Sequence, residues 1–280
     1  AMIHDGANGS LPVEHPDNPP ILAWAEWEHF TMTGDTARLK WLVEEKKYLQ
    51  KHFEYFHQLH GVWDQWQNTY RWSPEASGMI NTPRLRKMPV NHEEICTGGG
   101  HSYTCTEPPP LEWSDGSDFR WADATMQQCL AARCIKQIAG AIGADAVTNQ
   151  YTDTYAEWVD VMNSGNYSFG GPDYWDTRGA LVDGGGTSPV KPRTVDRFWV
   201  LLSGAPDSGR GDSLVEKLTL PHILGGPVPF PSVNLGDIDA DFDGRLWRGS
   251  VFPAMAYMGV KGIEKYGFAE RADEFARRVV

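Results

Sequence analysis

Apolar residues recur at intervals of three and four in eight segments of the chain, which is the pattern of one buried helix face. In the second segment, for example, Leu39, Leu42 and Leu49 fall on a single stripe. No segment shows a clear strand pattern. The eight predicted helices cover residues 18–33, 35–60, 123–142, 147–163, 195–204, 212–219, 254–266 and 269–280.

Turn and capping residues support these boundaries. Pro19 and Pro20 suit the first turn of the first helix, and Asp35 is placed to cap the second. Long Gly- and Pro-rich loops fill residues 61–120, 164–193 and 221–248. Because long loops in a compact domain usually carry function, we expect the site among them. The pattern therefore predicts an all-α domain with a loop-rich insertion at residues 61–120.

Composition and charge exclude two classes of partner. The chain has 280 residues, of which 41% are hydrophobic and 22% charged, as in an ordinary soluble domain. Its net charge is −12 and its basic residues form no block, which argues against nucleic acid and for a neutral or cationic ligand. No apolar run approaches the roughly 18–20 residues of a membrane span, so we expect no membrane partner.

Tryptophan is unusually abundant, with 12 residues in the chain. Core packing explains some of them, but each buried indole N–H needs a hydrogen-bond acceptor. Several stand in or beside the long loops, where flat aromatic faces suit the apolar faces of sugar rings. These loop tryptophans are Trp72, Trp113, Trp121, Trp175 and Trp247.

The four cysteines fall into two pairs. Cys96 and Cys105 flank a loop, so a local disulfide and an oxidising compartment are expected for them. That favours a secreted or periplasmic protein, with a cytoplasmic one as the alternative. Cys129 and Cys134 lie five apart on a predicted helix, where buried free thiols are expected.

Five sequence blocks resemble one enzyme family, in the same order along the chain. The chain is similar to glycoside hydrolase family 63 and the mannosylglycerate-hydrolase-like enzymes, which are related to trehalases. The blocks are NPPILAWAEWEHFTMTGD (18–35), ASGMINTPR (76–84), WADATMQQCLAARC (121–134), YWDTRG…RTVDRFWVLLSG (174–204) and PFPSVNLGD…LWRGSVFPAMAYMGVKGIEKYGF (229–268).

This resemblance implies an (α/α)6 toroid, in which twelve helices form six hairpins and the loops at one end line a pocket. About eight of the twelve helices are predicted here, so residues 1–280 are expected to form a single, partial barrel domain. It would be a fragment, an open toroid, or a barrel completed by a partner chain.

The resemblance also implies glycoside hydrolysis with inversion, which uses two carboxyl groups about 6.5–9.5 Å apart. The family's acid position is occupied by Ile80, which cannot donate a proton, and its base would lie beyond Val280. Substitute carboxyls are Glu75, Asp123 and Asp176. The alternatives are solvent exposure for Glu75, helix capping for Asp123 and loop structure for Asp176.

The same blocks supply candidates for sugar binding. Trp247 and Arg248 lead, because an indole stacks on a sugar ring while a guanidinium forks onto its hydroxyls or a carboxylate. The alternative for Arg248 is a salt bridge that fixes the loop. The remaining candidates are Trp24, Trp72, Asn81, Arg84, Trp121, Gln128, Tyr174 and Trp175.

One acidic stretch resembles the start of a calcium loop. Asp239, Asp241 and Asp243 precede Gly244, but the twelfth position holds Ser250 and not the Glu of an EF-hand. A Ca²⁺ site and a solvated acidic loop both stay open, and no other cofactor is expected.

We therefore predict an inverting glycoside hydrolase that acts on a small α-glycoside or an oligosaccharide. Two alternatives remain. The first is a carbohydrate-binding remnant of the family that lost its acid. The second is a lyase or epimerase on the same barrel; a lyase would use a Tyr/His pair, for which Tyr103 and His101 are the candidates.

Overall fold

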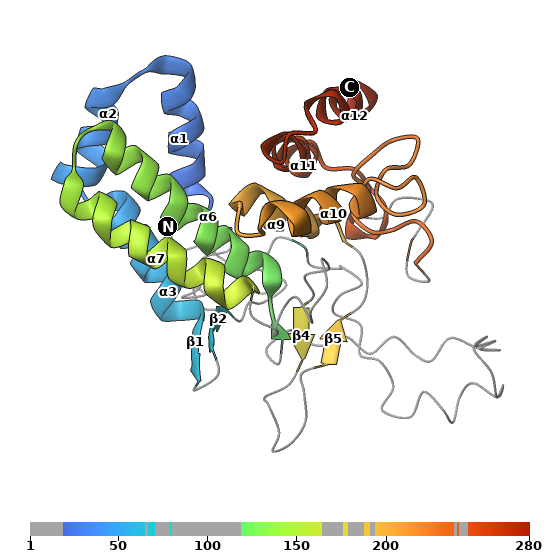
Figure 1. Cartoon of the computed structure of the whole chain (residues 1–280), viewed down its shortest axis with the longest axis horizontal. Coiled ribbons are helices and arrows are strands. Elements are labelled where there is room, and N and C mark those ends of the chain that lie inside the picture. The colour runs from blue at the N-terminus through green and yellow to red at the C-terminus, as the bar shows by residue number, and fades with distance from the viewer. Residues whose placement is uncertain are drawn as a thin grey trace, which may run out of the picture.

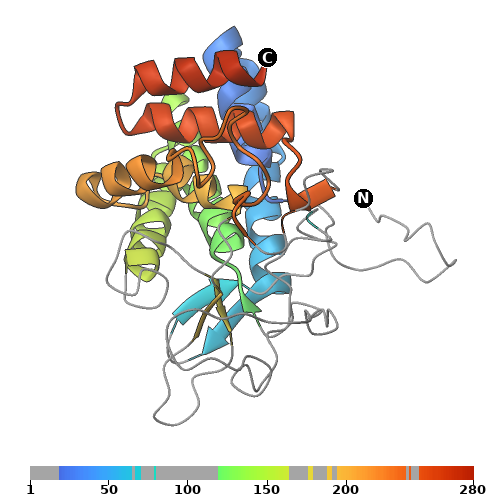
Figure 2. The same cartoon turned by 90° about the vertical axis from the view of Figure 1, so that its right-hand side faces the viewer.

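The computed structural model describes residues 19–64, 67–70, 79, 119–163, 176–178, 188–190, 194–237, 240 and 246–280. Its helices pack together in the upper part of the molecule, and its short strands lie below them (Figures 1 and 2). Among the described helices, none has the length and apolar character that crossing a membrane would require.

The N-terminal part contains three α-helices where two were predicted. Helix α1 (Leu22–Thr33) ends at Gly34, and the Asp35 side chain accepts the backbone N–H of Arg38. That confirms Asp35 as the cap of α2 (Thr36–Lys40), which continues into the π-helical turn η1 (Trp41–Glu45). The chain then breaks at Lys47, where φ is +53°, before α3 (Tyr48–His60). The predicted helix 35–60 is therefore two, because apolar spacing continues across a break of this kind.

Helices α6 (Ala122–Ala141) and α7 (Asp145–Asn163) form an antiparallel hairpin. Fifteen of the twenty residues of α6 are buried, so this helix has packed neighbours on nearly every side. It contacts α1, α3, α7 and α9. Its start is tied to the second strand, since the Trp121 N–H donates to the Tyr70 carbonyl at 2.9 Å.

The C-terminal part consists of short helices joined by tight turns. Helix α10 begins four residues before its predicted start, because Asp207 caps it by accepting the Arg210 N–H. The other helices agree closely with prediction. The elements are η3 (Val195–Arg197), α9 (Phe198–Ser203), α10 (Ser208–Leu218), η4 (Leu246–Arg248), α11 (Pro253–Lys265) and α12 (Ala269–Val279).

Two small antiparallel sheets were not predicted from the sequence. Strands β1 (Gly61–Asp64) and β2 (Gln67–Tyr70) form a hairpin in which Gly61 pairs with Tyr70. Strands β3 (Phe119–Arg120), β4 (Asp176–Arg178) and β5 (Ser188–Val190) pair in the order β3-β4-β5. Strands of two to four residues are too short for an alternating pattern to reveal.

A buried aromatic residue closes the core between the C-terminal helices. Phe230 is fully buried and packs edge-on against Phe198 of α9 and Phe275 of α12, with ring centroids 5.1 and 5.5 Å away. It also lies against Gly259 of α11, where an added Cβ would stand 2.4 Å from its Cε1 atom. One side chain from a loop thus joins three helices.

Candidate functional site

Residues near the starts of α1, α9 and α11 meet at Trp24. This indole packs edge-on against Trp199, with centroids 5.7 Å apart, and stacks against Tyr257 at 5.9 Å and 27°. Trp24 is only 8% exposed, whereas Tyr257 is 49% exposed. A ligand would therefore meet Tyr257 first, with Trp24 as the packed support behind it.

Glu28 completes this group, which we name the Trp24 cluster (Trp24, Glu28, Trp199 and Tyr257). The Trp24 Nε1–H donates to Oε1 of Glu28 and the Tyr257 hydroxyl donates to Oε2, each at 3.1 Å. Partial burial raises the pKa of Tyr257, and the negative charge of Glu28 adds to that effect. The phenol therefore stays protonated and a donor at neutral pH. The cluster offers an aromatic face beside an oriented carboxylate.

A second group of residues is organised around Ser232, which is fully buried. Its carbonyl accepts the Val195 N–H at 3.1 Å, and its own N–H donates to the Ser250 carbonyl at 2.9 Å. Its hydroxyl oxygen accepts the Gly249 N–H at 2.8 Å. Residues 231–233 thereby tie the start of η3 to the start of α11.

The Ser232 contacts position Trp247 and Arg248, because η4 directly precedes Gly249. The Trp247 ring stacks flat on Phe252, with centroids 3.9 Å apart and an angle of 17° between the planes. Trp247 and Arg248 are both partly exposed. Both side chains are therefore accessible to solvent, and their role in sugar binding stays a prediction.

Three other predicted residues lie deep in the interior. Trp121 has no exposed surface, and Asp123 is 2% exposed in the first turn of α6. The cap of α6 is Trp121, so Asp123 is not the capping residue that one interpretation expected. Gln128 is fully buried and donates to the Phe53 carbonyl at 3.1 Å. Whether Asp123 acts in catalysis, or the other two bind sugar, stays a prediction.

Most loop candidates fall outside the described residues. Asp176 is described only as backbone, the first residue of β4. Met79, next to Ile80, is buried in the core. The residues that fall outside are Trp72, Glu75, Ile80, Asn81, Arg84, Cys96, His101, Tyr103, Cys105, Trp113, Tyr174, Trp175, Asp239, Asp241 and Asp243.

The described residues contain no group of three potential metal ligands, and the acidic loop that might bind Ca²⁺ is not among them. Cys129 and Cys134 are free and fully buried, as predicted. Burial raises the pKa of both thiols to about 12, so neither ionises at neutral pH.

Sequence reasoning missed Glu28, Tyr257 and the buried pair Asp196–Arg197. The side chains of that pair are 0% and 3% exposed, and Arg197 Nε lies 3.9 Å from the Asp196 carboxylate. Glu28 had a usable signal, because it follows Trp24 by four residues and so shares its helix face. Tyr257 had none, since only tertiary packing brings α11 to α1.

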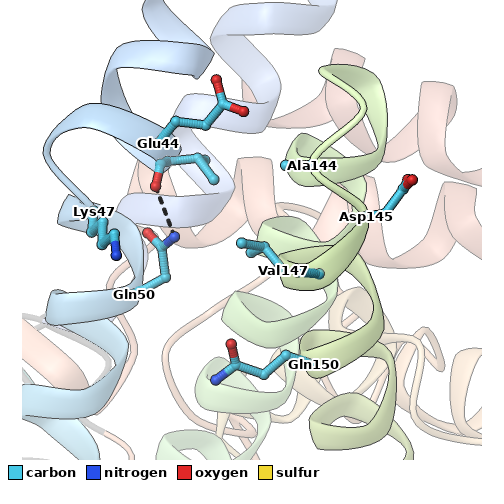
Figure 3. A pocket seen from close by; sticks show the side chains of 9 residues that line it. Glu44, Lys47, Gln50, Ala144, Asp145, Val147 and Gln150 are labelled. Atoms are coloured by element: carbon cyan, nitrogen blue, oxygen red, sulfur yellow. Dashed lines mark hydrogen bonds between the residues drawn. The ribbon is translucent and has the colours of Figure 1, made fainter.

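An open pocket of about 440 Å³ lies elsewhere, between η1, α3 and α7. Figure 3 shows charged and amide side chains on both walls, including Lys47 and Asp145. Gln50 is fixed there by its hydrogen bond of 2.9 Å to the Val43 carbonyl. The lining has no aromatic residue and none of the predicted site residues, so we do not assign the sugar site to it.

Comparison with known families gives one match that covers nearly the whole chain. The model of the mannosylglycerate hydrolase MGH1-like glycoside hydrolase domain matches residues 4–280. An uncharacterized protein of Borreliella burgdorferi is 31% identical over 86 residues, which are 31% of this chain and 18% of that protein. This chain therefore aligns with less than a fifth of that relative.

Solved structures from Thermus thermophilus share the fold. An uncharacterized conserved protein matches with a TM-score of 0.67 and 16% identity, over 96% of this chain and 70% of its own. The GH63 mannosylglycerate hydrolase in complex with glucose matches with a TM-score of 0.64 and 16% identity, over 96% of this chain and 68% of its own. The predicted (α/α)6-toroid fold is confirmed, with the chain covering about two thirds of such a structure.

Proposed function

This chain belongs to the mannosylglycerate hydrolase MGH1-like glycoside hydrolase family, and from that membership we propose that it hydrolyses a small α-glycoside or a short oligosaccharide. By the family's pattern the reaction proceeds with inversion at the anomeric carbon. A solved structure of the same fold, a mannosylglycerate hydrolase, is in complex with glucose, which supports a sugar as the substrate class.

The Trp24 cluster is the observation that carries this proposal. Sugar rings have apolar faces and hydroxyl-bearing edges, so a site for them needs an aromatic surface next to hydrogen-bonding groups. Tyr257 offers a half-exposed ring and Glu28 offers a carboxylate beside it. Because both oxygens of Glu28 already accept a hydrogen bond, the carboxylate is fixed in direction before any ligand binds.

Trp247 and Arg248 would supply the second surface of the site. Ser232 fixes the loop in which they lie to the start of η3 and to the start of α11. Helix α9, which follows η3, contains Trp199, and α11 contains Tyr257. A guanidinium donates to sugar hydroxyls or to a substrate carboxylate, and the indole stacks on the ring.

Inversion requires an acid that protonates the leaving oxygen and a base that activates water, about 6.5–9.5 Å apart. Ile80 cannot act as the acid, so we assign acid and base to the set Glu75, Asp123 and Asp176. Of these, Asp123 has a described side chain, and it is almost fully buried at the start of α6. Glu28 is assigned to binding, since two donors already hold its charge.

The absence of a carboxyl at Ile80 favours one alternative, a chain that binds sugars without hydrolysing them. The aromatic cluster would serve either function equally well. The two functions differ in turnover and in their response to a restored carboxyl group.

The deciding experiment is a hydrolysis screen of the purified chain against α- and β-glycosides, with the intact mass recorded on the same sample. Turnover is expected, and NMR of the first product should show the inverted anomer. Sugar binding without turnover would support the binding function, and Ile80→Asp should then create hydrolysis. Neither binding nor turnover by the intact chain would contradict both functions.

A further inference from the structure

Two cationic side chains converge on Gly204, at the C-terminal end of α9. Arg133 comes from α6 and Lys265 is the last residue of α11. Gly204 is the left-handed cap of α9, with φ +73°. An added Cβ on Gly204 would stand 2.7 Å from Arg133 Nη1 and 3.0 Å from Lys265 Nζ. The Lys265 Cε atom is nearer still, at 2.3 Å from that position, so both cationic side chains lie directly against Gly204, where any other residue would displace them.

The hydrogen bonds of Arg133 do not use all of its N–H donors. Arg133 Nη1 donates to the Ser203 carbonyl at 2.8 Å, which satisfies one end of its fork. Its Nε atom is buried and has no hydrogen-bond partner within the described part of the chain. A guanidinium has five N–H donors in a planar fork and matches an oxyanion well. The contact with the end of α9 thus uses only some of the N–H donors of Arg133.

Neither cation has an ion-pair partner among the described residues, although the chain has a net charge of −12. The nearby acids are engaged elsewhere: Glu264 pairs with Lys261 at 2.7 Å, and Asp207 with Arg210 at 3.6 Å. Partial burial of the ammonium group, with repulsion from Arg133, lowers the pKa of Lys265 to about 8, although part of the side chain is exposed. At neutral pH both groups still carry charge and repel each other, which an anion between them would relieve.

A third cation lies in the same neighbourhood. Lys136 Nζ stands 5.2 Å from the centre of the Tyr155 ring, and the Tyr155 hydroxyl donates to the Gly204 carbonyl at 3.0 Å. It has no carboxylate partner within the described ranges either. The surroundings of Gly204 are thus cationic on a chain that is acidic overall.

We propose that Arg133 and Lys265 form a binding site for a small oxyanion at the end of α9. The ligand chemistry is a phosphate, sulfate or carboxylate group, bound by the guanidinium fork and by the ammonium together. The site uses none of the residues of the Trp24 cluster and does not depend on glycosidase activity.

The test is thermal unfolding of the whole chain in sodium phosphate, with sodium chloride of equal ionic strength as the reference. Wild type should show a saturable rise in Tm of about 3–5 °C, because a ligand that binds only the folded state stabilises it. Phosphate also stabilises proteins by exclusion from their surface. That contribution should be equal in all variants and is removed by comparing them.

Lys265→Met is the diagnostic variant and Lys261→Met is its control, since Lys261 lies one turn earlier on α11 and is paired with Glu264. Lys261→Met should keep the phosphate response and Lys265→Met should lose most of it. Without phosphate, Lys265→Met should unfold at a higher temperature than wild type, because the repulsion from Arg133 is gone. Acetate tests the selectivity of the site: a response equal to that in phosphate indicates that carboxylates bind as well, and no response indicates a site for tetrahedral anions. An undiminished phosphate response in Lys265→Met would overturn the site.

Discussion

At the scale of single residues, Tyr70 shows how a polar side chain is accommodated inside the helical core. The ring is fully buried and lies against Phe56 and Trp158. Its hydroxyl shares a hydrogen bond of 2.7 Å with His57 Nδ1, and Gln128 Nε2 lies 3.5 Å away. Because Tyr70 ends β2, this contact fixes the hairpin to α3 and α6.

The His57 contact gives stability a dependence on pH. Burial lowers the pKa of His57 below 6.5, and the charges of Glu54 and Glu157 oppose that shift only in part. The unfolded chain therefore binds a proton before the folded chain does, and the free energy of unfolding should fall as pH drops below about 6.5. His57→Gln keeps a hydrogen-bonding group at this position but does not titrate.

Urea denaturation at pH 7.5 and 5.5 measures this effect. Wild type should lose more stability between the two than His57→Gln does. Some pH dependence will persist in the variant, because burial also lowers the pKa of His52. Equal losses in the two proteins would show that His57 is not responsible.

Removal of the Trp247 indole should weaken sugar binding. Trp247→Ala is expected to cost about 1 kcal/mol or more, which is roughly a fivefold rise in the Kd of a bound sugar. Calorimetric titration measures the change. Trp41→Ala is the control, because Trp41 is 39% exposed on η1 and its ring contacts Tyr48. Unchanged affinity in a folded Trp247→Ala protein would exclude the stacking role.

At the scale of elements, apolar periodicity located the helices. It failed to locate the break between two of them, because that break depends on a single backbone angle. The stripe that includes Leu39, Leu42 and Leu49 continues unbroken across Lys47, whose positive φ separates two helices. A positive φ at one residue does not change the spacing of the apolar residues, so the spacing cannot reveal it. The Asp35 cap was predictable because its signal is local, one side chain bonded three residues ahead.

Close packing between α11 and the loop before it should make Gly259 intolerant of a side chain. Gly259→Ala would place a Cβ 2.4 Å from the Cε1 atom of Phe230, a residue packed between Phe198 and Phe275. We expect a loss of about 1–3 kcal/mol in the free energy of unfolding, measured by denaturation in urea.

Gly140→Ala serves as the matched control. Gly140 lies in α6, is exposed, and an added Cβ would stand 4.0 Å from Thr148 Oγ1. Because alanine favours helix over glycine, this variant should be neutral or stabilised by up to about 1 kcal/mol. Equal effects of the two substitutions would mean that Phe230 moves freely.

At the scale of the whole molecule, the sequence predicted the toroid, whereas it pointed to only part of the candidate site. Motif order and helical spacing led to the (α/α)6 fold, and the fold of the Thermus thermophilus hydrolase confirms it. Only part of the Trp24 cluster could be predicted from the sequence. Trp24 lies in a recognisable motif, whereas Tyr257 bonds to Glu28 across 229 residues of chain. Pairings at such separations depend on how helices pack, which no local pattern records.

The enclosure of α6 also determines which helices open locally and which open only when the whole molecule unfolds. Amide protons exchange with solvent only when their hydrogen bonds open, and α6 cannot open without disturbing α1, α3, α7 and α9 around it. Its amides should therefore exchange at rates close to those of global unfolding. Helix α12, with two buried residues of eleven, should exchange far sooner. Deuterium uptake followed by mass spectrometry would compare the exchange rates of the two helices. The slowest-exchanging amides among the described helices should be those of α6.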